Sequence, residues 1–178
     1  MHAQKRWMLG INLLGGIAVL GSYAIGLVTH PGAGGALWGG VPDSLRPLYT
    51  AGMLLAALGY FAFLYFLLFR LDPGPARVGG RLGYGLFNLL LAAILVPSVL
   101  WMQLTIRMVQ QPGPGLWAAI RLVLALVGLA AVGLVLALLW LRPKQPRWAY
   151  WAAVAGAALF ALHTGVLDAL VWPSFFPV

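Results

Sequence analysis

Five apolar runs dominate the sequence and leave little choice of fold. They cover residues 8–29, 48–69, 82–106, 116–141 and 148–172. Each run reaches the roughly 20 residues that an α-helix needs to cross the hydrocarbon core of a bilayer. Segments with proline and glycine separate the runs where a membrane helix has to end. The pattern predicts a single transmembrane domain, residues 1–178, folded as an all-α bundle of five spanning helices.

The composition supports this fold class and excludes a water-soluble one. Of the 178 residues, 62% are hydrophobic and 8% are charged, whereas soluble domains carry roughly 25% charged residues. Three acidic side chains, Asp43, Asp72 and Asp168, cannot solvate a globule of this size. The sequence has no cysteine, which excludes disulfides, thiolate catalysis and cysteine-ligated metal centres.

Basic residues gather at one end of the predicted bundle. Alternate connections place eight cations on one side: Lys5, Arg6, Arg70, Arg77, Arg81, Arg142, Lys144 and Arg147. The other side holds three: Arg46, Arg107 and Arg121. Because cytoplasmic loops carry the excess of Lys and Arg, we expect the N-terminus in the cytoplasm and the C-terminus outside. The expected location is a membrane, a prokaryotic cytoplasmic membrane in particular.

The net charge of +8 does not indicate a nucleic-acid partner. Nucleic-acid recognition needs a basic face on a folded surface, and here the cations lie in short segments between apolar runs. The expected surroundings are therefore the lipid bilayer, with an apolar small molecule or partner membrane subunits as further candidates.

The first apolar run has an alternative interpretation as a secretory signal peptide. Lys5 and Arg6 precede it, and small residues follow it at positions 32–36. A signal peptide has an apolar stretch of about 7–15 residues, and this run is longer, so a spanning helix is the favoured interpretation. Cleavage would leave four helices with the same sidedness.

The longest connection between the predicted spans covers residues 30–47 and is rich in glycine. One interpretation is a flexible outer loop, with Trp38 dipping into the headgroup region. The other is a lid over an outward-facing cavity, since long loops in compact proteins often act as lids. Asp43 and Arg46 are spaced for a short turn with a local ion pair.

Small residues recur at helical spacing and predict the faces on which the helices pack. In the fifth span they occupy every fourth position: Ala149, Ala153, Ala157, Ala161, Gly165 and Ala169. The corresponding face of the fourth span consists of Ala118, Arg121, Ala125, Gly128 and Val132. The face predicted for the first span consists of Asn12, Gly16, Tyr23, Gly26 and His30. In the second span, Gly52, Ala56 and Gly59 form such a face.

Three ionisable residues lie inside the predicted spans: Arg121, His163 and Asp168. A charge at mid-membrane costs roughly 2.5–3.5 kcal/mol on insertion scales, so such residues are rare. The fourth and fifth spans are joined by a short connection and should be antiparallel neighbours. Arg121 precedes Leu141 by twenty residues and Asp168 follows Trp148 by twenty. We therefore predict that both charges lie at the same depth and form an ion pair.

Two alternatives to a functional ion pair stay open at this point. Arg121 could extend to the outer headgroups while Asp168 ends its helix in water. A pair that does form could also be purely structural and fix the register of two helices.

His163 lies five residues before Asp168, which places the two about 140° apart on an α-helix. We therefore expect His163 outside the cluster unless the helix kinks, as a neutral histidine hydrogen-bonded across the bundle. The alternative is an axial ligand of a b-type haem. Ligands for a three-histidine or carboxylate metal site are missing, and no cofactor is predicted.

Polar residues at the outer ends of the spans extend this set. The third span ends with Trp101, Gln103 and Arg107, and the second begins with Tyr49. All four lie at the predicted level of the two charges, so an outward-opening cavity is expected there. The candidate ligand-binding residues are Arg121, Asp168, His163, Trp101, Gln103, Arg107 and Tyr49.

The sequence carries no motif of a nucleophilic or nucleotide-binding enzyme. We therefore expect a non-enzymatic bundle that binds a lipid, a quinone or another apolar ligand, or that acts as an accessory subunit of a membrane complex. The alternative is a proton-coupled carrier, or a subunit of a haem- or quinone-dependent membrane oxidoreductase. In that case Asp168 and His163 would be the titrating groups.

Overall fold

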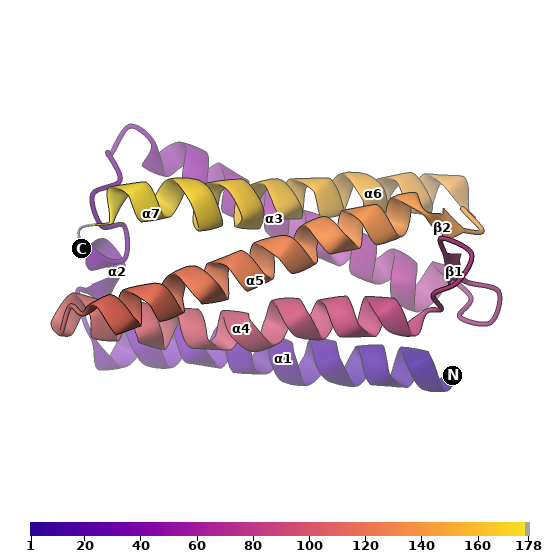
Figure 1. The fold of residues 1–178 in the computed structure, drawn as a ribbon, viewed down its shortest axis with the longest axis horizontal. Coiled ribbons are helices and arrows are strands. Elements are labelled where there is room, and N and C mark those ends of the chain that lie inside the picture. The colour runs from indigo at the N-terminus through magenta and orange to yellow at the C-terminus, as the bar shows by residue number, and fades with distance from the viewer. Residues whose placement is uncertain (177–178) are drawn as a thin grey trace.

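The computed structural model describes residues 1–176. They form five long helices whose axes all run roughly along the long axis of the molecule (Figure 1). Three of these helices are uninterrupted: α1 (Ala3–Thr29), α4 (Gly85–Gln110) and α5 (Pro114–Leu139). The other two contain π-helical segments: α3 (Arg46–Tyr65) with η1 (Phe66–Arg70), and α6 (Arg147–Ala161) with η2 (Leu162–Val171) and α7 (Trp172–Phe175). All five are long and apolar enough to cross a membrane, as predicted. The largest difference from the predicted limits is at α1, which begins at Ala3 rather than at residue 8.

The remaining elements are short and lie in the connections. α2 (Ala33–Ala36) interrupts the connection between α1 and α3. Strands β1 (Arg77–Val78) and β2 (Leu141–Arg142) pair antiparallel and join two connections at the end of the bundle where α1 begins (Figure 1). α7 lies at the opposite end (Figure 1).

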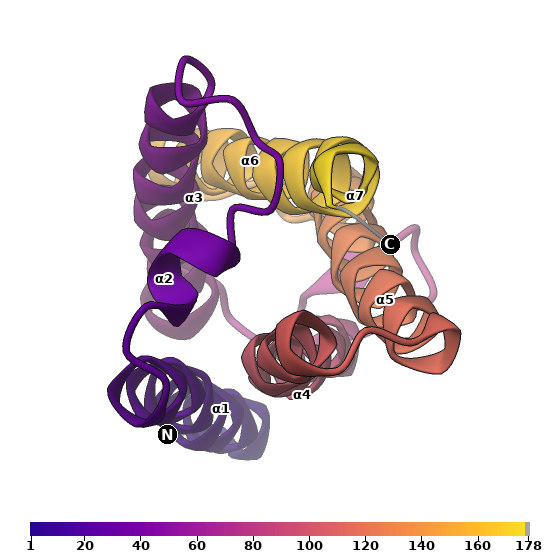
Figure 2. The same cartoon turned by 90° about the vertical axis from the view of Figure 1, so that its left-hand side faces the viewer.

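Seen along its axis, the bundle is an incomplete ring (Figure 2). The helices pack in the order α1, α4, α5, α6 and α3. α1 and α3 stand at the two ends of this order and, within the described residues, lack an extended packing contact. α2 lies between them at one end of the bundle (Figure 2). The side of the ring between α1 and α3 is therefore not closed by helix packing.

Four of the six residues on the predicted small-residue face of the fifth span are buried, and Gly165 and Ala169 are half-buried. Ala149, Ala153 and Ala157 belong to the apolar core. The tightest crossing joins α6 to α3 at Gly156 and Gly59, where a Cβ added to Gly156 would lie 2.5 Å from the carbonyl oxygen of Gly59. Helices in lipid associate through such close backbone packing, because lipid tails are as apolar as the side chains and the hydrophobic effect does not drive the helices together.

The predicted packing face of α5 is wrong. Of its five members only Gly128 is buried. Beside Gly128, Ala130, Ala131 and Ala137, the buried face of α5 carries six larger residues: Ile120, Val123, Leu124, Val127, Leu134 and Leu138. The reason is that α5 packs on both α4 and α6–η2, so it fills the space between two neighbours with large side chains.

The predicted face of α1 is confirmed at Gly26 but not at Gly16. Gly16 has open space beside it, whereas a Cβ added to Gly15 would lie 2.9 Å from Leu95 of α4. Gly26 packs against Met102 of α4. α1 therefore packs on α4, and hydrogen bonds from Asn88 to Gln4 strengthen this contact.

Candidate functional site

A cavity of about 610 Å³ lies inside the incomplete ring. All five long helices contribute to its wall, and so does the connection that contains α2. Its volume is within the roughly 300–1,000 Å³ that is usual for small-molecule sites. Most lining side chains are apolar, and the polar ones are Tyr23, Trp38, Tyr49, Tyr60, Ser98, Trp101, His163, Thr164, Asp168 and Trp172.

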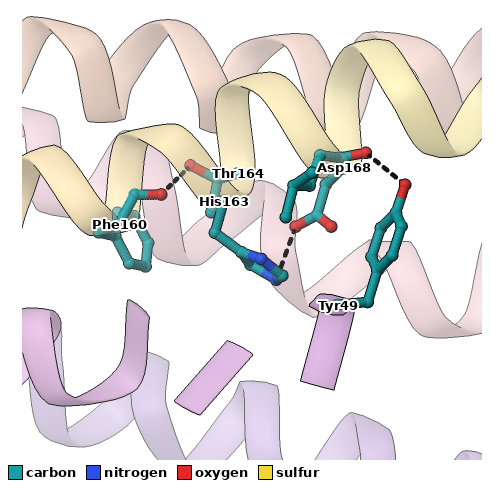
Figure 3. A network of polar contacts seen from close by, with 6 residues as sticks. Tyr49, Phe160, His163, Thr164 and Asp168 are labelled. Atoms are coloured by element: carbon teal, nitrogen blue, oxygen red, sulfur yellow. Dashed lines mark hydrogen bonds and ion pairs between the residues drawn. The ribbon is translucent and has the colours of Figure 1, made fainter. Parts of the chain in front are cut away.

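The π-helix η2 supplies His163, Thr164 and Asp168 to this wall (Figure 3). A π-helix closes each hydrogen bond five residues along the chain instead of four. Residues five apart therefore come onto nearly the same side, and His163 Nε2 lies 3.6 Å from Asp168 Oδ2. This corrects the expectation that His163 stands apart from Asp168 and hydrogen-bonds across the bundle.

The imidazole of His163 is seated against α3. Its side chain is 9% exposed, and a Cβ added to Gly52 of α3 would lie 2.9 Å from its Nδ1. Nδ1 is buried without a hydrogen-bond partner among the described residues. Because Gly52 has no side chain, the imidazole of His163 can lie directly against the backbone of α3.

Asp168 is more accessible than His163, with 32% of its side chain exposed. The hydroxyl of Tyr49 on α3 donates a hydrogen bond of 3.2 Å to the carbonyl oxygen of Leu167, the residue before it (Figure 3). This bond fixes α3 beside the carboxylate. Thr164 donates its hydroxyl to the carbonyl oxygen of Phe160 in its own helix at 2.9 Å.

Aromatic side chains gather at the same end of the cavity. Tyr23 of α1 stacks on Trp101 of α4, with ring centroids 5.7 Å apart. Trp101 in turn meets Trp172 at 5.9 Å, and Trp38 meets Tyr49 at 6.1 Å. The Nε1 of Trp101 is buried without a hydrogen-bond partner among the described residues. We refer to these five residues as the aromatic cage.

The connection of residues 30–47 covers this end of the cavity. Trp172 Nε1 donates a hydrogen bond to the carbonyl oxygen of Leu37, and the backbone N–H of Gly40 donates one to that of Phe175. Leu37 and Trp38 line the cavity. These contacts favour the lid over the flexible loop.

The predicted ion pair within that connection is confirmed. Arg46 Nη1 lies 2.8 Å from Asp43 Oδ1.

The cavity also meets the outside of the bundle between α1 and α3. Leu20, Met53 and Phe61 line it, yet they are 73%, 50% and 67% exposed. On one side of this opening, the Tyr60 hydroxyl donates a hydrogen bond to Asn12 and so joins α3 to α1. On the other side lies α2 (Figure 2). We call this apolar opening the α1–α3 window.

Of the seven predicted site residues, four line the cavity: Tyr49, Trp101, His163 and Asp168. The other three do not line it. Gln103 Nε2 donates a hydrogen bond of 3.0 Å to the carbonyl oxygen of Ser22 and so joins α4 to α1. Arg107 and Arg121 are exposed.

The predicted ion pair between Arg121 and Asp168 is wrong: among residues 1–176 the two form no ion pair. The reason is a difference in register. α5 approaches η2 most closely where Gly128 lies against Gly165. Arg121 lies seven residues before Gly128, whereas Asp168 lies only three residues after Gly165. At the level of Arg121 the other helix therefore presents Trp172, four residues beyond Asp168. Arg121 therefore stands about one turn too far along the axis.

Several lining residues were not among the predicted set, notably Tyr23, Trp38, Tyr60, Thr164 and Trp172. Two signals could have found some of them. Tyr23 belongs to the predicted face of the first span, and Thr164 and Trp172 lie four residues before and after Asp168. For Trp38 and Tyr60 the sequence carries no comparable signal.

Comparison of the chain with protein-family models, curated proteins and solved structures gives no match. The case for a function therefore depends on the residues of the cavity.

Proposed function

We propose that this chain is a small multi-pass membrane protein that binds a lipid, a quinone or another apolar ligand in its cavity without transforming it. The observation that carries the proposal is the cavity itself, which has a mostly apolar wall and a cluster of polar and aromatic groups around Asp168. This combination is typical of sites that hold an apolar body and orient a polar group.

The exterior of the helices supports a membrane location. Large apolar side chains are exposed on every long helix, for example Leu14, Leu54, Leu89, Leu129 and Leu170. Soluble proteins rarely expose apolar surface on this scale. The eight cations predicted on one side belong to elements or connections at the end where α1 begins. By the positive-inside rule, that end faces the cytoplasm in our proposal, and the aromatic cage faces outward.

The hydroxyl groups of the cavity favour binding over catalysis. Ser98 and Thr164 both donate to carbonyl oxygens of their own helices, at 2.7 and 2.9 Å. His163 faces a carboxylate rather than a hydroxyl. A nucleophile activated by an adjacent base is therefore not assembled among these residues.

Native mass spectrometry of protein extracted in a mild detergent tests this proposal. Ala57 and Leu58 are both exposed, but only Ala57 also lines the cavity. Ala57→Trp should therefore obstruct the cavity, whereas Leu58→Trp places the same side chain at a neighbouring position outside it. We expect the wild type and Leu58→Trp to carry one bound apolar molecule, and Ala57→Trp to lose it. Equal occupancy in all three proteins would contradict the proposal. Co-purification of a stoichiometric membrane subunit without a bound molecule would favour the accessory-subunit function instead.

The contact between His163 and Asp168 supports a second candidate, a proton-coupled carrier. Two titratable side chains 3.6 Å apart in a membrane helix form a plausible proton-binding pair. Proton flux in liposomes that depends on a substrate, and that is lost in Asp168→Asn, would favour this function.

Haem ligation is less favoured, because His163 Nε2 faces Asp168 and Nδ1 lies against Gly52. An absorbance spectrum of the purified protein checks the haem alternative.

A further inference from the structure

The cavity carries one acidic side chain, that of Asp168, and its described lining includes neither lysine nor arginine. The side chain of Asp168 is 32% exposed, and a carboxylate that is partly withdrawn from water is costly unless it is paired or hydrogen-bonded. The only nearby base is His163 at 3.6 Å, a distance too long for a hydrogen bond. The charge balance of the cavity therefore favours a ligand that brings a positive charge.

The aromatic cage surrounds the same end of the cavity. Tyr49 donates its hydroxyl to the carbonyl oxygen of Leu167, the residue before Asp168, and Trp172 follows Asp168 by four residues. Tyr23 joins this group through its stacking on Trp101. An aromatic face attracts a cation that lies within about 6 Å of its ring centroid, and tryptophan is the strongest of these partners. Three of the five cage residues are tryptophans, and one of them, Trp38, already has the Arg46 guanidinium 5.7 Å from its ring centroid. A carboxylate together with several aromatic faces is the combination that recognises an ammonium group.

The rest of the cavity suits an apolar chain. Away from the cage its wall is formed by residues such as Val19, Ile94, Val127 and Phe160. The α1–α3 window then opens this apolar part sideways, between helices whose outer surfaces are apolar. A chain that begins in the cage can therefore leave through the window into lipid without crossing a polar layer.

We propose that the ligand is a single-chain amphiphile with an ammonium head group. The head lies between Asp168 and the aromatic cage, and the tail follows the apolar wall toward the α1–α3 window. This inference rests on the proposed function, since it names the ligand class of the same cavity. A volume of about 610 Å³ suits one chain and a small head, with any excess length extending through the window.

Binding of two radiolabelled probes to the full chain in phosphatidylglycerol nanodiscs tests the inference. The probes are tetradecyltrimethylammonium and tetradecanol, with binding to empty nanodiscs subtracted. We expect the ammonium probe to bind the wild type about tenfold more tightly than the alcohol, which corresponds to one charge and several cation–π contacts. Asp168→Asn should reduce this preference, because it removes the charge and leaves the aromatic cage in place. Asp72→Asn, which changes an exposed carboxylate outside the cavity, should retain it.

A second variant keeps the test informative if Asp168→Asn does not fold. Trp38→Leu changes a cage residue in the connection rather than in a spanning helix. It should weaken binding of the ammonium probe several-fold and leave binding of the alcohol unchanged.

The outcomes separate this inference from the proposed function. Equal affinity for both probes in the wild type, displaced in both cases by Ala57→Trp, would overturn the ammonium head group but keep the apolar-ligand cavity. Absence of saturable binding by either probe would overturn both. Competition by lysophosphatidylcholine would support the inference and identify a lipid head group as the source of the ammonium. Competition by alkylammonium ions alone would support it with a free amine as the source.

Discussion

His163 Nε2 lies 3.6 Å from the Oδ2 of Asp168, five residues further along the same helix. In an α-helix these side chains would point about 140° apart. The π-helix Leu162–Val171 brings them onto one side, toward the cavity (Figure 3). π-helical turns within α-helices often occur at functional sites, and this one supplies three of the polar side chains of the cavity wall.

Substitution of Gly52 should disturb this pair from the opposite helix. In Gly52→Ala the new Cβ would lie 2.9 Å from His163 Nδ1, so the imidazole has to move. We expect the free energy of unfolding to fall by about 1–3 kcal/mol, as for other overpacked sites, together with weaker ligand binding. Gly16→Ala has open space and should gain up to about 1 kcal/mol from helix propensity. A denaturation series in detergent compares the two, and equal stability of the variants would contradict the packing described here.

The crossing of α3 and α6 should be the most sensitive packing contact in the bundle. A Cβ at Gly156 would lie 2.5 Å from the backbone carbonyl oxygen of Gly59, and backbone atoms cannot rotate away as a side chain can. We therefore expect Gly156→Ala to separate the two helices and to cost at least as much as Gly52→Ala. Gly21→Ala, with nothing nearby, is the control. Thermal unfolding measures the difference, and an unchanged midpoint in Gly156→Ala would argue against this crossing.

Tyr84, in the connection before α4, should make stability depend on alkaline pH. It is 2% exposed, its hydroxyl donates to the carbonyl oxygen of Leu67 at 2.8 Å, and burial raises the pKa of that hydroxyl above its ordinary value. The unfolded chain therefore releases this proton at about pH 10, while the folded chain retains it. The stabilisation is complete below that pH and is lost as the pH rises through the folded-state pKa.

The comparison with Tyr84→Phe isolates this contribution. Above about pH 10, the wild type should lose up to about 1.4 kcal/mol more per pH unit than the variant. At neutral pH, Tyr84→Phe should cost about 0.5–1.5 kcal/mol for the lost hydrogen bond. Parallel pH profiles of the two proteins would show that Tyr84 ionises equally in both states.

The fold could be predicted because its main determinant is local. Each apolar run is long enough for a span, and the breakers between runs end the helices. The ion pair of Asp43 with Arg46 is local as well, since three residues in one turn separate the two charges.

The site could be predicted only in part, because it depends on how helices depart from regular geometry and on how they meet. Pairing Arg121 with Asp168 assumed equal rise and regular rotation in both helices. η2 changes the rotation, and the contact of Gly128 with Gly165 shifts the register. The α1–α3 window follows from the order of the helices around the ring, which the apolar runs do not encode.

Photolabelling with a reactive amphiphile shows where the tail of a bound ligand lies. A tetradecylammonium probe with a diazirine at the end of its chain is irradiated with the protein in nanodiscs, and the labelled peptides are mapped by mass spectrometry. We expect saturable labelling of α1 around Leu20 and of α3 around Phe61, at the α1–α3 window. This labelling should disappear in Ala57→Trp and persist in Leu58→Trp. Unsaturable labelling spread over the outer faces of all five helices, unchanged by Ala57→Trp, would contradict this position of the tail.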